Sequence, residues 1–106
     1  MINERHDTYQ YFKPQSNTFY KSDFIAPINN PIDIILDLNH FKAINNLLQV
    51  ILLDLSKDQV SKGRCLVVVK SDITDFFEPD SLIVVPTLEE AENFIQMERI
   101  QRDLGL

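Results

Sequence analysis

The chain ends with a short apolar strand followed by a capped amphipathic helix. Leu82–Val85 are apolar and stop at Pro86, and Thr87 then stands where a helix N-cap is preferred. Glu90, three residues later, completes a capping box. We expect a helix over residues 88–104 that Gly105 caps, with one apolar stripe made of Leu88, Ala91, Phe94, Ile95, Met97, Ile100 and Leu104. A strand that leads directly into such a helix is typical of an α/β sheet.

Three buried strands and a second helix are predicted in the central part of the chain. Residues 32–38, 64–70 and 81–85 carry nearly continuous apolar runs, which suit strands covered on both faces. Between the first two of these, residues 47–62 have apolar side chains at helical spacing, with Asn45 and Asn46 as caps and Gly63 as the stop. Their broad apolar face would hold Leu47, Leu48, Val50, Ile51, Leu52, Leu55 and Val60. Because strands separated by a helix need a crossover, we predict a small single-domain α/β sheet of 4–5 mostly parallel strands with helices packed on it.

The amino-terminal third is less regular. Residues 1–6 are polar and are expected to be disordered, whereas residues 7–13 are aromatic and β-prone and form a predicted strand that Pro14 ends. Residues 16–30 fit either a short helix or the second strand of a hairpin, and the prolines near their end stop both. We therefore expect residues 7–106 to form one domain.

Composition and charge narrow the possible partners. The chain has 106 residues and a net charge of −6, which disfavours nucleic acid and an anionic membrane surface as partners. Its single cysteine, Cys65, lies in an apolar run and excludes an internal disulfide. The amino terminus has no apolar signal core, and the apolar stretches are too short to span a bilayer. We expect a cytoplasmic protein that does not bind membranes.

The segment from Ile35 to Leu53, a hydrophobic strand, a short loop and a helix start, resembles the STAS domain of bacterial anti-sigma factor antagonists. The resemblance covers roughly residues 32–104 and implies a STAS-like fold that binds a protein partner. In that family an Asp-Ser-Ser/Thr-Gly signature opens the helix, and one of its hydroxyls is the phosphorylation switch. Asn45 and Asn46 stand at these positions here, followed by Leu47 and Leu48. The resemblance therefore implies a member without the phosphorylatable residue.

The tail, from Ile83 to Glu92 and from Met97 to Gly105, looks like that of short bacterial STAS-like proteins of unestablished role. Some of those carry the label ribonuclease Z. That enzyme class needs a dense His-x-His-x-Asp-His cluster, and this chain has only His6 and His40. The label does not describe an activity of this chain, although an accessory role beside an RNA-processing enzyme stays open.

No catalytic or cofactor motif stands out. The two histidines have no metal-ligand spacing, and the acidic loop of Asp72, Asp75, Glu78 and Asp80 is interrupted by Phe76 and Phe77. Neither a glycine-flanked serine nor a glycine-rich phosphate loop is present. We expect no enzyme activity, no metal and no cofactor.

The predicted partner-binding surface is the corner before and at the start of the second helix, where STAS-like proteins bind their partners. Its residues are His40, Phe41, Lys42, Asn45, Asn46 and Gln49. The alternative is that Phe41 and Ile44 anchor this loop to the core. A possible second contact is Phe76 with Phe77, unless a helical turn points both inward.

The function predicted from the sequence is a non-enzymatic STAS-like protein–protein interaction module. The alternatives are a small-ligand or lipid-binding domain and a structural subunit. The last includes a homodimer paired through the aromatic amino-terminal strand at a sheet edge. The sequence leaves monomer and homodimer open.

Overall fold

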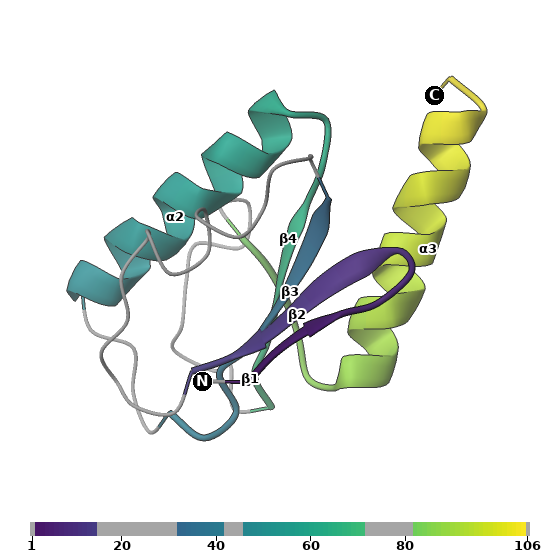
Figure 1. Ribbon diagram of the computed structural model, residues 1–106. Coiled ribbons are helices and arrows are strands. Elements are labelled where there is room, and N and C mark those ends of the chain that lie inside the picture. Colours follow the sequence, from purple (N-terminus) through teal and green to yellow (C-terminus); the bar gives the residue numbers. More distant parts are fainter. Residues whose placement is uncertain (1, 15–31, 42–45, 72–81, 106) are drawn as a thin grey trace.

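The computed structural model describes residues 2–14, 32–41, 46–71 and 82–105, which form a small α/β domain (Figure 1). The described strands make one five-stranded sheet, and the two described helices pack on it. In chain order the elements are β1 (Ile2–Arg5), β2 (Tyr9–Lys13), β3 (Asp33–Asp37), α2 (Asn46–Ser61), β4 (Leu66–Val69), β5 (Ile83–Val85) and α3 (Leu88–Asp103). The predicted fold class is thereby confirmed.

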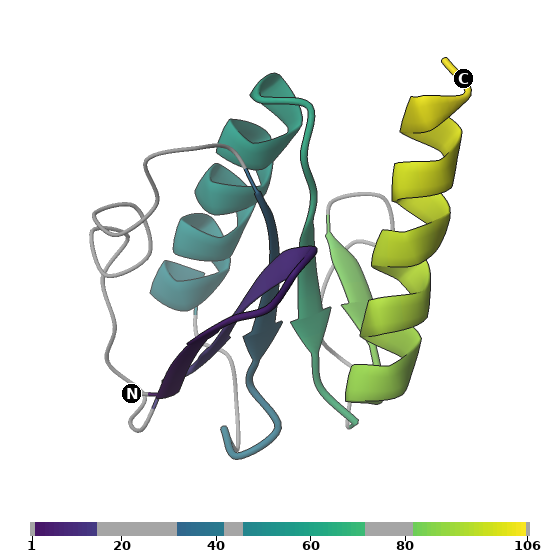
Figure 2. The ribbon, with the colours of Figure 1, turned by 45° about the vertical axis from the view of Figure 1, so that its right-hand side comes forward.

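The strands lie side by side in the order in which they occur along the chain. β1 is antiparallel to β2, and β2, β3, β4 and β5 are mutually parallel. One row of the sheet runs through Tyr11, Ile35, Val67 and Ile83. Because neighbouring parallel strands start at the same edge, β3 and β4 share an amino end and a carboxyl end (Figure 2).

The amino terminus differs from the sequence expectation. We expected residues 1–6 to be disordered, but Ile2–Arg5 form β1 and pair with β2. The turn between them is closed by the His6 amide, which donates to the Tyr9 carbonyl at 2.9 Å, while the two rings stack with centroids 4.6 Å apart. The sequence missed β1 because this polar segment gains its hydrogen bonds from β2, a tertiary partner.

The aromatic strand is not at a sheet edge. β2 pairs with β1 on one side and with β3 on the other, so its backbone donors and acceptors are used. A homodimer paired through this strand is therefore incompatible with the sheet. β1 occupies the edge that the aromatic strand was expected to form.

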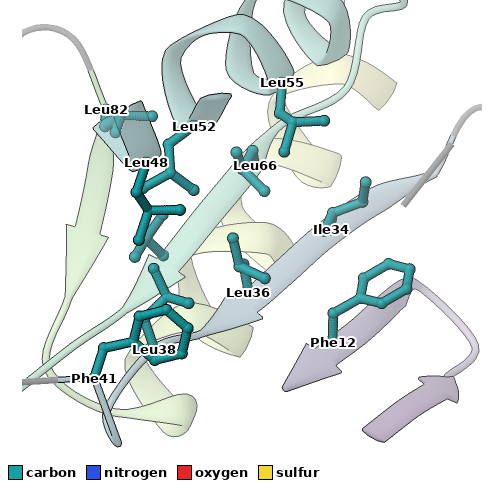
Figure 3. Close-up of a cluster of buried hydrophobic side chains, with 11 residues drawn as sticks. Phe12, Ile34, Leu36, Leu38, Phe41, Leu48, Leu52, Leu55, Leu66 and Leu82 are labelled. Atoms are coloured by element: carbon teal, nitrogen blue, oxygen red, sulfur yellow. The ribbon is translucent and has the colours of Figure 1, made fainter. Parts of the chain in front are cut away.

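The two faces of the sheet bury separate hydrophobic clusters. Ile34 and Leu36 of β3 point toward α2, where Leu48, Leu52 and Leu55 meet them (Figure 3). On the opposite face, Ile35 packs with two β4 valines and with two α3 residues, and this second cluster comprises Tyr9, Ile35, Cys65, Val67, Val69, Ala91 and Ile95. Alternate residues of β3 thus face different helices, as the two-residue period of a strand requires. Each buried Leu, Ile or Val side chain contributes about 1.5–3 kcal/mol, which explains why the middle of β3 and the whole of β4 are apolar.

The start of α3 and the end of α2 are capped as the sequence predicts. Thr87 Oγ1 accepts a hydrogen bond from the Glu90 amide at 3.1 Å, which is half of the predicted capping box. After α2, Gly63 has a φ of +71°, and its amide donates to the Val60 carbonyl at 3.0 Å. A side chain at that left-handed position would be strained, so a glycine is favoured there.

The prediction that the apolar residues of α3 form one buried face is wrong. Ala91 and Ile95 are buried and Phe94 is half-buried, whereas the other members are exposed: Leu88 (38%), Met97 (57%), Ile100 (46%) and Leu104 (67%). Residues 91 and 95 are one turn apart and share a side, but residues 97 and 100 point roughly the opposite way. Likewise, Leu47, Val50 and Val60 of α2 are exposed although the pattern placed them on its buried face.

A charged anchor ties the end of α3 to the amino end of the sheet. Asp33 is buried, and Arg102 Nη2 donates to both of its carboxylate oxygens, at 2.7 and 2.9 Å. The Cys65 amide donates to the same carboxylate at 2.9 Å. The carboxylate therefore joins β3, β4 and α3. Such a pair costs several kcal/mol to desolvate, so it fixes geometry more than it adds stability.

Candidate functional site

The predicted corner lies at the carboxyl end of β3, where the chain leaves the sheet and continues through Leu38–Phe41. In the same row β4 ends and is followed by Lys70 and Ser71. Ligands of parallel α/β sheets usually bind outside the carboxyl ends of the strands. This location makes the corner the first candidate for a functional site.

Asp37 is the centre of the corner's hydrogen bonding. Its Oδ2 accepts from the Tyr11 hydroxyl at 2.6 Å, and its Oδ1 accepts from the Asn39 amide at 3.0 Å. Burial, together with the hydrogen bond to Asp37, raises the pKa of Tyr11 well above its usual range. Tyr11 therefore stays protonated and donates to Asp37 at any physiological pH. Both carboxylate oxygens are used for internal bonds.

Two further contacts connect the loop after β3 to the end of β4. Asn39 Oδ1 accepts from the Ser71 amide at 2.6 Å. Lys70 is only 4% exposed, and its Nζ donates to the Phe41 carbonyl. Side-chain bonds thus hold the described part of this loop, up to Phe41, from both directions.

The aromatic pair of the corner is divided between core and surface. Phe41 is 2% exposed and packs in the cluster under α2, so the structure gives it the anchoring role that the sequence left as an alternative (Figure 3). Its side chain is not available to a partner. His40, in contrast, is exposed and sits edge-on to the Phe41 ring, with centroids 4.7 Å apart.

The start of α2 presents two large apolar side chains to solvent. Leu47 is 70% exposed and Val50 is 62% exposed, and three positions apart they share one side of the helix. Leu48 between them is buried, and Gln49 is half-buried and already has an interaction within the protein. The first turn of α2 holds no acidic residue, so no side chain there offsets the partial positive charge of the helix start.

Several predicted site residues cannot be placed. Lys42 and Asn45 lie outside the described residues, as do Phe76, Phe77 and the whole acidic loop. Asn46 is the first residue of α2, and its backbone alone is described. The helix-or-strand alternatives for residues 16–30 fall outside the described ranges as well.

The sequence analysis missed Tyr11, Asp37, Asn39 and Lys70. A signal for three of them exists, because Asp37, Asn39 and Lys70 stand at or just after the ends of two apolar strands. Once those strands are taken as parallel neighbours, their carboxyl ends must meet. Tyr11 has no such signal, since its contact with Asp37 depends on the pairing of β2 with β3.

The chemistry of the remaining reactive groups is limited. Burial, and then the charge of Asp33, raise the pKa of the Cys65 thiol to about 12, so it is a poor nucleophile. Within the described ranges, no three His, Cys, Asp or Glu side chains group as they would to hold a metal ion. Among the helices that the structure describes, none has the length and apolarity of a membrane span.

No protein-family model matches the chain, and no curated protein matches it. The resemblance to STAS domains therefore stays a prediction from the residues.

Proposed function

We propose that this chain is a non-enzymatic, STAS-like protein-interaction module of the cytoplasm that binds its partner at the corner. The contact surface is His40 together with the first two turns of α2. The observation that carries the proposal is the exposure of Leu47 (70%) and Val50 (62%) beside a loop held rigid from within.

The physical argument is one of shape and apolar surface. Asp37, Asn39 and Lys70 bond to protein groups, so the loop keeps one conformation and little entropy is lost when a partner docks. Covering a leucine or valine side chain contributes about 1.5–3 kcal/mol. Two such side chains on one helix face form the centre of a small interface. The expected partner surface is therefore an apolar pocket, with acceptor groups that face the unneutralised start of α2.

The proposal includes the absence of a phosphorylation switch at this corner. Asn45 and Asn46 occupy the positions at which the STAS signature has hydroxyl residues. Binding is then set by the partner's concentration rather than by phosphorylation of this helix start.

A matched pair of valines provides the test. Val50 and Val60 are on the same helix and are similarly exposed (62% and 68%), but they lie at opposite ends of it. The full-length chain and its Val50→Ala, Leu47→Ala and Val60→Ala variants are used to capture partners from the cells of origin, and affinities are then measured with the purified partner.

We expect Val50→Ala and Leu47→Ala to weaken binding by about tenfold or more each, as loss of an interface anchor of about 1.4 kcal/mol requires. Val60→Ala should bind like the unchanged chain. Equal affinity of the Val50→Ala and Val60→Ala variants would contradict the proposal, as would a folded chain that captures no protein.

A further inference from the structure

All four arginines of the chain line one pocket of about 190 Å³. They come from separate parts of the fold. Arg5 ends β1, Arg64 precedes β4, and Arg99 with Arg102 belong to the last turns of α3. None of the lysines in the described ranges lines this pocket.

The pocket lies at the amino end of the parallel strands, opposite to the corner. The turn after β1, the starts of β3 and β4 and the end of α3 all lie at this end of the sheet (Figure 2). It is therefore a separate site, and nothing in the proposed protein-binding function uses it.

The positive charges in the pocket exceed the negative ones. Its acidic residues are Asp33 and Asp7, against four arginines. Asp33 is already committed to Arg102 by the two hydrogen bonds of 2.7 and 2.9 Å. Among the lining residues, the other three guanidinium groups are thus balanced only by the exposed Asp7 carboxylate. The pocket is therefore positively charged although the chain has a net charge of −6.

The remaining guanidinium groups have spare donors. Arg5 and Arg99 are exposed and form no ion pair with any residue that the structure describes. Arg64 is half-buried and spends Nη1 on the neighbouring Gly63 carbonyl at 3.0 Å. A guanidinium has five N–H donors, so most donors of these three groups are available to a ligand.

A purely structural explanation accounts for part of the arrangement. Basic residues near the end of α3 offset its carboxyl-terminal partial charge of about half a unit. That charge is small beside the excess in the pocket, and it does not explain why Arg5 and Arg64 converge from other elements.

Size and charge indicate the ligand. The pocket of about 190 Å³ is smaller than the roughly 300–1,000 Å³ typical of sites for drug-sized ligands, and it has room for a tetrahedral anion. A phosphate group carries about −1.5 to −2 charges at neutral pH, which matches the excess of two positive charges. Arginine forks also match phosphate oxygens in pairs, as the point charge of lysine does not.

We infer that the arginine pocket at the amino end of β3 and β4 binds a phosphate dianion, either free or as the monoester of a small molecule. Arg5, Arg64 and Arg99 provide the direct donors. Asp33 is a positioning residue, because it fixes Arg102 and with it the end of α3 at the rim of the pocket.

Thermal unfolding and titration calorimetry of the full-length chain test this inference. Inorganic phosphate is compared with chloride at equal ionic strength, and glycerol 3-phosphate serves as the ester. A ligand that binds only the folded chain raises the melting temperature in a concentration-dependent way. We expect such a rise with phosphate and none with chloride.

Two variants identify the site. Arg99→Ala and Arg64→Ala each remove pocket donors, and each should weaken phosphate binding by about tenfold or more. Lys62→Ala is the control, because it removes the same charge from an exposed neighbour of Arg64 that does not line the pocket. It should change the dissociation constant less than about twofold, since an exposed charge outside the pocket is screened by water and salt.

The outcomes separate clearly. Loss of binding in the arginine variants alone supports the inference, and tighter binding of phosphate or of glycerol 3-phosphate then assigns the free ion or the ester. Equal weakening by Lys62→Ala would show that phosphate responds only to net charge and would overturn the inference. Absence of phosphate-dependent stabilisation would overturn it as well. Neither result bears on the corner, which is tested with the valine pair.

Discussion

The two ends of the parallel sheet handle polar side chains in opposite ways. At the carboxyl end, the side chains of Asp37, Asn39 and Lys70 form hydrogen bonds with the segments that follow β3 and β4. The surface that remains exposed there consists of His40 and apolar side chains of α2. At the amino end, Asp33 pairs with Arg102, and the other three arginines of the pocket form no ion pair with a described residue.

This difference distinguishes a polar network that stabilises one loop conformation from one that leaves positive charge unneutralised. Where donors and acceptors match, the network stiffens the chain and a partner meets a fixed contour. Where cations outnumber anions, the site stores repulsion that an added anion relieves. We therefore propose a protein partner for the first end and a small anion for the second.

The largest effect is expected from breaking the internal pair at the amino end. Arg102→Met leaves the buried Asp33 without its cation, and we expect a loss of about 3–5 kcal/mol of unfolding free energy, measured by urea denaturation. Arg99→Met, on the same helix but exposed, should change it by less than about 0.5 kcal/mol. Similar stabilities for the two variants would mean that the Asp33–Arg102 contact does not hold α3 to the sheet.

A smaller loss is expected at the carboxyl end. Lys70→Met removes the donor to the Phe41 carbonyl and should cost about 1–3 kcal/mol. Lys57→Met, an exposed change on α2, is the control and should be nearly neutral. If both variants unfold at the same urea concentration, the corner is not held by its buried lysine.

The free energy of unfolding should also fall at alkaline pH, because buried tyrosine and cysteine side chains have raised pKa values. Burial raises the pKa of Tyr9 and Cys65 to about 12, from ordinary values of 10.0 and 9.0, and it raises the pKa of Tyr11 as well. Because the folded pKa values exceed the unfolded ones, this stability is complete below about pH 9 and is lost as the pH rises toward 12. Urea midpoints between pH 8 and 12 measure the loss.

Tyr11→Phe isolates the contribution of the corner. At neutral pH it removes the hydrogen bond to Asp37 and should cost about 1 kcal/mol. Its stability should then fall less steeply with pH than that of the unchanged chain, because one titrating group is gone. An unchanged alkaline slope would show that Tyr11 titrates alike in the folded and unfolded chain.

The features that could be predicted from the sequence are those that neighbouring residues determine. The caps at Thr87 and Gly63 and the continuous apolar runs of β3 and β4 are readable from neighbouring residues, and the structure confirms them. β1 was not predictable, because its polar residues become a strand only by pairing with β2. The split of the α3 stripe follows from helical geometry, because residues 97 and 100 lie roughly opposite residues 91 and 95, and the single-stripe prediction overlooked this.

The two candidate sites differ in the same respect. The corner was predicted from the resemblance to STAS domains, and Phe41, one of its predicted contact residues, belongs to the core. The arginine pocket was missed, because Arg5, Arg64 and Arg99 are far apart along the chain and meet only through the sheet order. No local pattern marks any of them as a ligand residue.

The most direct test of this division of roles is a phosphate titration of the isotopically labelled full-length chain, followed by two-dimensional amide NMR. We predict that the amide signals of Asp33, Arg64 and Cys65 shift with phosphate, whereas those of Asn39, His40 and Val50 stay in place. Shifts centred on the carboxyl end, or shifts spread evenly over both ends, would contradict the assignment of the anion site to the amino end of the sheet.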